Sequence, residues 1–431
     1  MNQELDRRQF FGAVGGATAA LTATGAKADT NSQIQCGVIG IGRRGAGLLR
    51  GVLKMPDVRV TALCDIKAGH LERGREMVVA AGQAKPPGYG EKGPLDYRRM
   101  LERKDLDAVV IATPMQDHAV MSIDAMRAGK AALSEVAAAV TMDECWGLVR
   151  AAEETGQLYM LAENACYFRN LMTVWNMIRA GLFGRLTYGE CGYVHDCRFL
   201  NFEGDGSLSW RGRLVRDHVG NWYPTHAIGP VAQWMGINKT DRFASLVAMT
   251  TPPVGARRDA VRRFGTDSPQ AKTPFSKGDS ITTLIQTASG AMIDLRCDTL
   301  SSRPHRTTTY HTIQGETGSY RSLTGDVWTE SRSKAYKWQT LEQYAEEFDH
   351  PLWKQWEQQA KDSGHGGVDF FVMKEFLDAV RNNTASPIDA YDAAAWSCIV
   401  PLSAKSIHQG NARVEIPDFT GGRVKVTPVD A

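Results

Sequence analysis

Short apolar runs alternate with amphipathic stretches in the first part of the chain, starting near residue 33. The runs that we interpret as buried strands span Ile34 to Ile39, Val58 to Cys64, Ala108 to Ala112, Ala131 to Ser134 and Leu158 to Ala162. Because strands and helices in alternation favour a parallel sheet with right-handed crossovers, the pattern predicts a doubly wound α/β domain over residues 33–162. The Pro- and Gly-rich segment from Lys85 to Gly90 is predicted to be a surface loop.

The pattern changes after residue 163, where longer strands follow one another. The predicted strands span Leu186 to Val194, Phe243 to Thr250, Ser280 to Thr287, Ala291 to Leu300 and Thr307 to Gln314. Two polar stretches, Asp196 to Asn221 and Thr251 to Lys277, exceed ordinary connections in length and are candidate site-forming loops. Helices are predicted over Gly367 to Asn382 and Ala390 to His408. Residues 163–431 are therefore expected to form an α+β domain with an open, mostly antiparallel sheet.

The composition is that of an ordinary globular enzyme. The length of 431 residues exceeds what one core usually supports, so two domains are expected. Hydrophobic residues make up 43% of the chain and the net charge is +2, which excludes the clustered basic charge of a nucleic-acid-binding protein. The eight cysteines show neither CxxC nor Cys/His ligand spacing, so they imply no metal site and no disulfide framework. Cys191 and Cys197 remain one candidate pair.

The N-terminus is interpreted as an export signal. An Arg-Arg pair at residues 7–8 and a Phe-Phe pair at residues 10–11 precede a Gly/Ala-rich run, which ends in the Ala-x-Ala site at residues 26–28. This order is typical of a twin-arginine signal peptide, and the run is too short and too weakly apolar to span a bilayer. We therefore expect residues 1–28 to engage the twin-arginine export machinery and the mature protein to be periplasmic or secreted, without a membrane span.

A dinucleotide-binding fingerprint lies between the first predicted strand and the first predicted helix. Residues 38–45 read Val-Ile-Gly-Ile-Gly-Arg-Arg-Gly, which contains GxGxxG. In this context Gly40 permits a tight turn, Gly42 lets the backbone approach a pyrophosphate, and Gly45 allows close packing of strand and helix. The first domain is therefore predicted to be a Rossmann domain.

The cofactor is predicted to be NAD. Asp65 ends the second strand, twenty residues beyond Gly45, where a carboxylate can accept both ribose hydroxyls and disfavours a 2′-phosphate. Arg43 and Arg44 belong to the predicted cofactor site, and because basic residues also serve a phosphate they leave NADP open.

Residues 34 to about 320 resemble the superfamily of glucose-fructose oxidoreductase and inositol dehydrogenase. The matching segments are Ala112-Thr113-Pro114, His118, Ala128-Gly129-Lys130 and Ser134-Glu135. The resemblance implies that Glu135 and Asn164 belong to the cofactor site, and that His118 is structural or lies near the nicotinamide. The triplet Glu135-Val136-Ala137 replaces Glu-Lys-Pro, so the lysine that helps ordinary sugar dehydrogenases to deprotonate a hydroxyl is absent.

Nearly the whole mature chain is similar to the NAD-dependent α-N-acetylgalactosaminidase family of glycoside hydrolases. The segments that carry this resemblance are Glu163 to Tyr167, Trp210-Arg211, Gly220 to His226, Gln314 to Gly318, His365 to Gly367 and Ala393 to Ser397. The resemblance implies catalytic roles for Tyr167 and His226 and substrate contacts for Arg211 and Tyr223. His305 stands where the family pattern has a substrate tyrosine.

The segment Tyr223-Pro224-Thr225-His226 supports acid/base chemistry without the resemblance. A phenol and an imidazole three residues apart at the start of a helix can be aimed at one point, and imidazole titrates near neutrality. The alternative is a core histidine. Trp210 and Trp222 are candidate sugar-stacking residues, and His365 is either a third site residue or a helix cap.

The resemblance implies a glycosidase in which bound NAD takes a hydride from carbon 3 of the sugar. The resulting ketone acidifies the proton on carbon 2, the aglycone is eliminated, water adds, and the hydride returns. Two alternatives stay open: a periplasmic NAD(P)-dependent sugar oxidoreductase, and a non-catalytic sugar-binding protein that keeps NAD as a structural element. A homo-oligomer is expected because open antiparallel sheets in this superfamily commonly pair.

Overall fold

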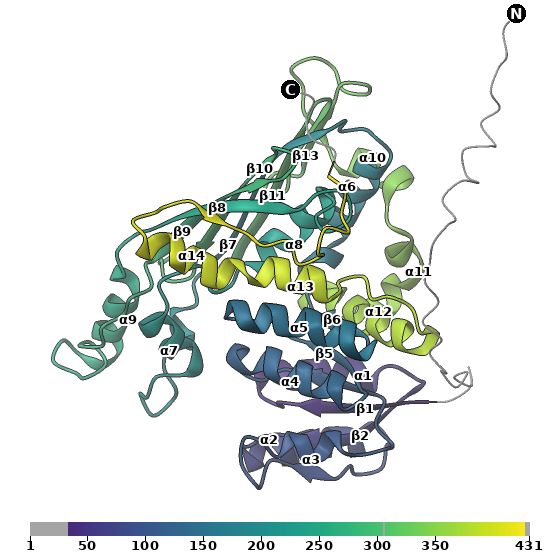
Figure 1. Cartoon of the computed structure of the whole chain (residues 1–431), viewed down its shortest axis with the longest axis vertical. Helices are drawn as coiled ribbons and strands as arrows, with labels where there is room; N and C mark the ends of the chain where they lie inside the picture. The colour runs from purple at the N-terminus through teal and green to yellow at the C-terminus, as the bar shows by residue number, and fades with distance from the viewer. Residues whose placement is uncertain (1–32, 305–306, 427–431) are drawn as a thin grey trace, which may run out of the picture. The chain divides into compact units, whose positions relative to one another are not determined.

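The first apolar runs form a parallel sheet in the computed structural model, which describes residues 33–304 and 307–426 (Figure 1). The order of its six strands is β3-β2-β1-β4-β5-β6. The strands are β1 (Ile34–Ile39), β2 (Val58–Cys64), β3 (Gly88–Tyr89), β4 (Ala108–Ile111), β5 (Ala131–Ser134) and β6 (Tyr159–Leu161). The helices that alternate with them are α1 (Arg43–Leu53), α2 (Ala68–Ala80), α3 (Tyr97–Leu101), α4 (Met115–Arg127) and α5 (Met142–Thr155). The predicted doubly wound domain is confirmed.

One prediction for this domain was wrong. The segment from Lys85 to Gly90 contains the edge strand β3, which pairs in parallel with Leu63 and Cys64. The amide of Leu63 donates to the carbonyl of Pro87 at 3.2 Å, so the strand forms directly after the prolines. A strand of two residues is too short to leave a hydrophobic pattern.

The second part of the chain builds a nine-stranded sheet with the order β14-β13-β12-β11-β7-β10-β9-β8-β15. Its strands are β7 (Leu186–His195), β8 (Phe243–Thr250), β9 (Ser280–Thr287), β10 (Met292–Asp298), β11 (Thr307–Gly315), β12 (Gly318–Arg321), β13 (Asp326–Thr329), β14 (Gln339–Thr340) and β15 (Val414–Glu415). Only the β7–β10 pair is parallel, which confirms the mostly antiparallel sheet. The strands β12 to β15, which have two to four residues each and lie at the two edges of the sheet, were not predicted.

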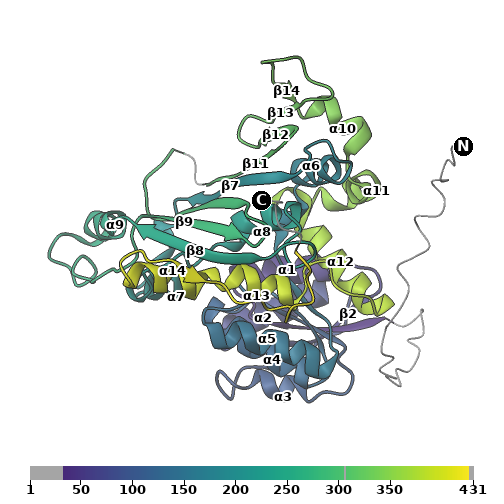
Figure 2. The same ribbon diagram turned by 45° about the horizontal axis from the view of Figure 1, so that its top comes forward.

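Helices cover one face of this sheet and join it to the first. The helical segments of this part are η1 (Asn164–Tyr167), α6 (Arg169–Arg179), η2 (Arg198–Leu200), α7 (Trp210–Asp217), α8 (Thr225–Trp234), α9 (Val254–Phe264), α10 (Glu342–Phe348), α11 (Pro351–Ala360), η3 (His365–Gly367), α12 (Val368–Asn382), α13 (Ala390–Ser397) and α14 (Ile399–His408). Helix α8 packs on β7 and β11, and α14 packs on β8. Helix α13 contacts α5, so α13 and α14 lie between the large sheet and the first domain (Figures 1 and 2).

Two further expectations need correction. The helix predicted over Ala390 to His408 is interrupted at Cys398, because Pro401 has no amide to donate to Ser397 and its ring crowds that carbonyl. The stretch from Thr251 to Lys277 was expected to be a site-forming loop, but it contains helix α9. Its end packs against α7, where the amides of Ser276 and Lys277 donate to the carbonyl of Val215 at 3.3 and 3.0 Å.

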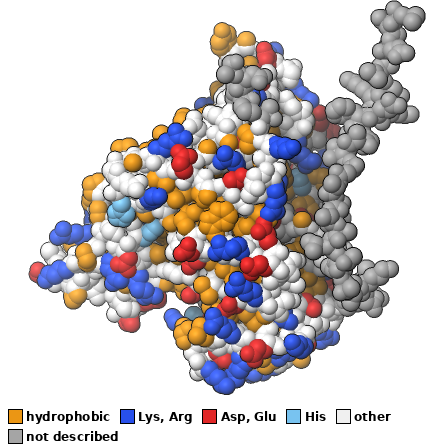
Figure 3. All heavy atoms as spheres, viewed as in Figure 1, with side chains coloured by type: hydrophobic (Ala, Val, Ile, Leu, Met, Phe, Trp, Pro, Cys, Tyr) orange, Lys and Arg blue, Asp and Glu red, His pale blue; other side chains and the backbone are white. Residues whose placement is uncertain are grey.

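Charged side chains of both signs lie on the surface, and the cysteines lie in the interior. Positive and negative side chains are interspersed over the face seen in Figure 3. Within residues 33–304 and 307–426, no helix is long and apolar enough to cross a membrane, and no cluster of three or more His, Cys, Asp or Glu side chains is suited to a metal ion. All eight cysteines are buried and free, Cys191 and Cys197 included.

Candidate active site

A cavity of about 1240 Å³ lies between the two sheets. Residues at the carboxyl ends of β1, β2, β4 and β5 line one side, which is where open α/β sheets bind ligands. The segment from β7 to α7, the start of α8 and the start of α12 line the other side. Since one drug-sized ligand usually takes about 300–1,000 Å³, the cavity has room for a cofactor and a second molecule.

The glycine turn after β1 forms the floor of this cavity. Gly40 has φ +83°, and a Cβ there would lie 2.8 Å from the backbone of Ala112. A Cβ on Gly45 would lie 1.8 Å from the carbonyl oxygen of Gly40. A Cβ on Gly42 would meet nothing within 4 Å and would enter the cavity. The turn is therefore tight on its protein side and open on its cavity side, as a dinucleotide requires.

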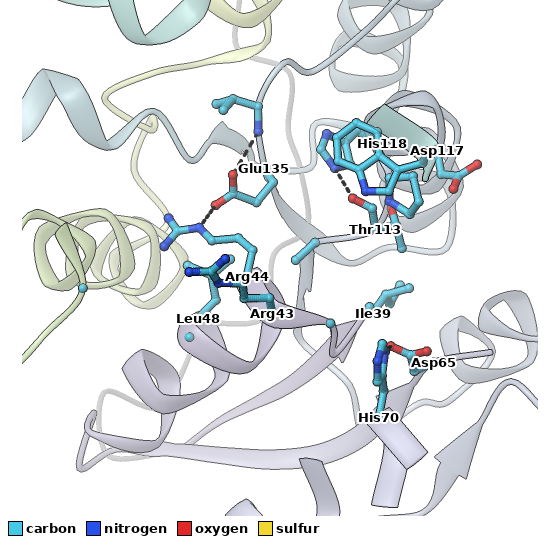
Figure 4. A pocket seen from close by; sticks show the side chains of 18 of the residues that line it. Ile39, Arg43, Arg44, Leu48, Asp65, His70, Thr113, Asp117, His118 and Glu135 are labelled. Atoms are coloured by element: carbon cyan, nitrogen blue, oxygen red, sulfur yellow. Dashed lines mark hydrogen bonds and ion pairs between the residues drawn. The ribbon is translucent and has the colours of Figure 1, made fainter. Parts of the chain in front are cut away.

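Asp65 lies beside this turn and lines the cavity. Its carboxylate accepts hydrogen bonds from the amides of Ile41 at 2.6 Å and Lys67 at 2.8 Å, which fix its position. His70 lies beside it, with Nδ1 at 3.3 Å (Figure 4). Arg43 is exposed and also lines the cavity.

Arg44 is engaged by two carboxylates. Its Nε donates to Glu135 at 2.6 Å (Figure 4), and its two terminal nitrogens donate to Asp369 at 2.5 and 3.0 Å. Asn164 and His365 complete the shell of Asp369, at 2.8 and 2.9 Å. Burial opposes the ionisation of Asp369, but these hydrogen bonds outweigh it and hold its pKa well below its usual range. The guanidinium of Arg44 is thus occupied within the protein and not free for a 2′-phosphate.

His226 forms a buried pair with Glu163 on the opposite wall. Its Nδ1 lies 2.6 Å from Oε1 of Glu163, a residue that is fully buried. Burial works against a charged imidazole, but the carboxylate of Glu163 outweighs burial and raises the pKa of His226. The same pairing lowers the pKa of Glu163 against the effect of burial. The pair is therefore an ionised carboxylate that favours a protonated imidazole.

Aromatic rings surround His226. The ring centroids of Tyr193 and Tyr223 lie 5.4 and 5.1 Å from the imidazole centroid. Burial raises the pKa of both phenols, so they remain hydroxyl donors at neutral pH. Trp222 packs against Tyr223 at 5.3 Å and against the edge of Trp210 at 6.4 Å.

Arg211 lies over the ring of Trp210, with 4.0 Å between the guanidinium carbon and the ring centroid. Within residues 33–304 and 307–426, Arg211 forms no ion pair. Arg211, Trp210 and Trp222 all line the cavity, so the first candidate loop forms its wall while the second does not reach it.

Two predicted site residues, Tyr167 and His118, are not brought into this constellation. Tyr167 does not line the cavity, because its buried ring stacks on Phe371 with 6.4 Å between centroids. His118 does line it, but its two ring nitrogens each lie 2.9 Å from a backbone carbonyl, of Ala137 and of Thr113. His305 lies outside the described residues.

The structure adds three residues to the site: Tyr193, Glu163 and Asp369. Tyr193 belongs to the predicted strand from Leu186 to Val194, where it could have been taken for an ordinary strand residue. Glu163 and Asp369 each stand at the start of a helical segment next to a predicted site residue, which was the available signal. Their partners are far away in sequence, so spacing does not reveal them.

Comparisons with protein families divide the chain in two. Residues 34–163 match the model described as "Oxidoreductase family, NAD-binding Rossmann fold". Residues 167–426 match "Glycosyl hydrolase 109, C-terminal domain". The cofactor of the first domain is therefore NAD.

Relatives of similar length carry the same description. A "Glycosyl hydrolase family 109 protein" of Stenotrophomonas maltophilia is 37% identical over 98% of this chain and 97% of its own length. An "Alpha-N-acetylgalactosaminidase" of Tannerella forsythia is 37% identical over 91% of this chain and 88% of its own length.

Solved structures share the fold at low identity. Levoglucosan dehydrogenase in complex with NADH superposes with a TM-score of 0.69 at 18% identity, over 90% of this chain and all of that chain. Scyllo-inositol dehydrogenase from Lactobacillus casei has a TM-score of 0.63 at 14% identity, over 89% of this chain and 99% of that chain.

Two glycine substitutions should separate folding from cofactor binding. Gly42→Ala places its methyl group in the cavity, so the protein should keep its stability but bind NAD about tenfold more weakly or worse, about 1.4 kcal/mol. Gly45→Ala forces its methyl group into the carbonyl of Gly40 and should cost about 4 kcal/mol of folding free energy or more. Thermal unfolding and the NAD content after dialysis measure the two effects. If both variants lost the same stability and the same amount of NAD, the separate roles assigned to Gly42 and Gly45 would be contradicted.

Proposed function

The chain belongs to glycosyl hydrolase family 109, and from this premise we propose that it removes terminal α-linked N-acetylgalactosamine from glycosides. The observation that carries the proposal is the single cavity in which the glycine turn and Asp65 face His226, Tyr223 and Arg211. The name of the Tannerella forsythia relative, an alpha-N-acetylgalactosaminidase, supports the choice of sugar.

The glycine turn and Asp65 would hold NAD, since Gly42 leaves space toward the cavity and the carboxylate of Asp65 stands at the end of β2. Bound NAD supplies a reversible hydride acceptor, so it is restored in each turnover and no second substrate is needed. The absence of the Glu-Lys-Pro lysine, replaced by Val136, distinguishes this site from that of an ordinary sugar dehydrogenase.

The protein's own groups divide the remaining work. His226 is placed to take and return a proton, because it lines the cavity and its Nδ1 is tied to Glu163. The phenols of Tyr193 and Tyr223 are placed to hydrogen-bond a sugar hydroxyl. Trp210 and Arg211 offer an aromatic face and a cation at the rim.

The mechanism makes a prediction about the bond at carbon 2 of the sugar. A substrate deuterated there should lose its label to solvent during turnover, because elimination removes that proton, whereas displacement by paired carboxylates leaves the bond intact. An aryl N-acetyl-α-galactosaminide incubated without added NAD, followed by mass spectrometry of the product, measures the exchange. A product that keeps its deuterium excludes the elimination route.

The variant His226→Ala should lower kcat about a hundredfold or more while NAD stays bound, since the imidazole acts on the sugar and lies outside the dinucleotide turn. Gly42→Ala, which should lose NAD and keep His226 intact, is the matched comparison. If the sugar were instead converted to a stable ketone, with one NADH formed for each sugar, the result would indicate the alternative function of a sugar oxidoreductase. Binding without turnover would indicate a sugar-binding protein.

We also propose that the chain is exported by the twin-arginine pathway and works in the periplasm or outside the cell. The support is the sequence of residues 1–28, which lies outside the described residues. Replacing Arg7 and Arg8 by Lys together should stop export and leave the protein folded and active in the cytoplasm. Cell fractionation measures this, and normal export of the variant would refute the assignment.

A second copy of the chain is the partner that we propose for the open face of the nine-stranded sheet. Met249, Leu284 and Met292 lie on this face and are 61%, 42% and 42% exposed. The double variant Leu284→Glu and Met292→Glu should shift the protein to a monomer in analytical ultracentrifugation without lowering its melting temperature. A wild-type chain that sediments as a monomer would remove the proposal.

A further inference from the structure

We propose that Glu163 is the positioning residue of this enzyme: it fixes His226 with Nδ1 protonated and Nε2 available to the cavity, and it stabilises the imidazolium that forms when Nε2 takes a proton from the sugar. The inference deepens the proposed function, because it rests on His226 as the group that exchanges that proton.

A contact other than the one with His226 also fixes the position of the Glu163 carboxylate. Glu163 directly precedes η1, and its Oε1 accepts a hydrogen bond from the amide of Ala165 at 3.0 Å. The same oxygen lies 2.6 Å from Nδ1 of His226, and the hydroxyl of Thr225 is a further, weaker neighbour of the carboxylate. A buried carboxylate with one strong partner is tied to that partner, because its charge has no access to water. The electrostatic effect of the Glu163 carboxylate therefore acts mainly on His226.

This contact assigns the two nitrogens of the imidazole. An ionised carboxylate accepts hydrogen bonds only, so Nδ1 must carry its proton in both states of the ring. Nε2 is then the nitrogen that gains and loses a proton, and it has no hydrogen-bond partner among the described residues. The residue lines the cavity, so the basic nitrogen is the one on the substrate side.

The backbone of His226 is fixed separately. The ring of His311, on β11, lies with Nε2 at 3.0 Å from the carbonyl oxygen of His226. Burial lowers the pKa of His311 to about 4, so it remains a neutral donor across the working range of pH. The role of Glu163 is thus distinct: it acts on the ring and its charge, whereas His311 holds the main chain.

The charges that face His226 come from several elements. Glu163 precedes η1, Glu135 ends β5 and Arg44 begins α1, while the neutral phenols of Tyr193 and Tyr223 pack against the ring. Burial by itself lowers the pKa of His226, and Glu163 is the largest of the influences that raise it. Loss of the Glu163 charge should therefore move the pKa of His226 downward. A base with a lower pKa is deprotonated over a wider range of pH but takes a proton less readily.

Glu163→Gln tests this directly, because the amide oxygen can still accept from Nδ1 while the charge is lost. In the NAD-loaded protein labelled with nitrogen-15 histidine, the pKa of His226 should fall by about 1–3 units, with the proton of the neutral ring still on Nδ1. In pH profiles of kcat/KM, the acidic limb should move down by the same amount and the plateau should fall about tenfold or more. The resonance of His226 is identified by its absence from His226→Gln.

Two further variants separate positioning from folding. Glu163→Asp keeps the charge, so the pKa of His226 should stay raised while the rate falls through the lost contact. Asp392→Asn removes another buried carboxylate, one that accepts from Asn238 at 3.0 Å and does not line the cavity, and should leave the profile unchanged.

An unchanged titration of His226 in Glu163→Gln, or a neutral ring protonated on Nε2 in the wild type, overturns the proposal. The histidine titration needs no substrate, so it is decided even if the protein proves inactive on N-acetylgalactosaminides. A shifted titration without any glycosidase activity would refute the proposed function alone and keep Glu163 as the partner that sets the state of His226.

Discussion

The interaction on which the site depends is the ion pairing of Arg44 with Glu135 and Asp369. It joins the start of α1 to the end of β5, 91 residues away, and to α12, 325 residues away. The side chains of both carboxylates are almost fully buried, so removing the guanidinium would leave Glu135 without its ion-pair partner and Asp369 with only His365 and Asn164. Helix α12 is thereby held against the dinucleotide turn, and the wall of the cavity is closed on that side.

The ion pairs of Arg44 with Glu135 and Asp369 also determine which groups remain available for chemistry. The guanidinium of Arg44 binds two protein carboxylates. The turn therefore presents its backbone and open space to the cofactor, and Arg44 is not available as a free cation. On the other wall, Glu163 takes up one nitrogen of His226 and leaves the other. The cavity thus combines a charged side, where a dinucleotide fits, with an aromatic side that includes the imidazole of His226.

Local sequence signals predicted the parts that depend on local geometry. Five strands of the first sheet, the turn at Gly40 and the carboxylate at Asp65 follow from hydrophobic runs and glycine spacing. Edge strands such as β3 leave too few residues for a pattern. Tyr167 and Tyr193 show the other limit: both are tyrosines in apolar surroundings, and only packing decides that the first stacks on Phe371 while the second faces His226.

The protonation states in the cavity favour elimination over direct displacement. A glycosidase that works with paired carboxylates needs one of them protonated at neutral pH, which requires a raised pKa. Here Arg44 binds both Glu135 and Asp369, and the pKa of Asp369 is held low. Glu163 is likewise kept ionised by its pairing with His226. His226, whose pKa the carboxylate of Glu163 raises against the effect of burial, is placed at the cavity to exchange a proton, and a base that takes a proton from carbon is what elimination requires.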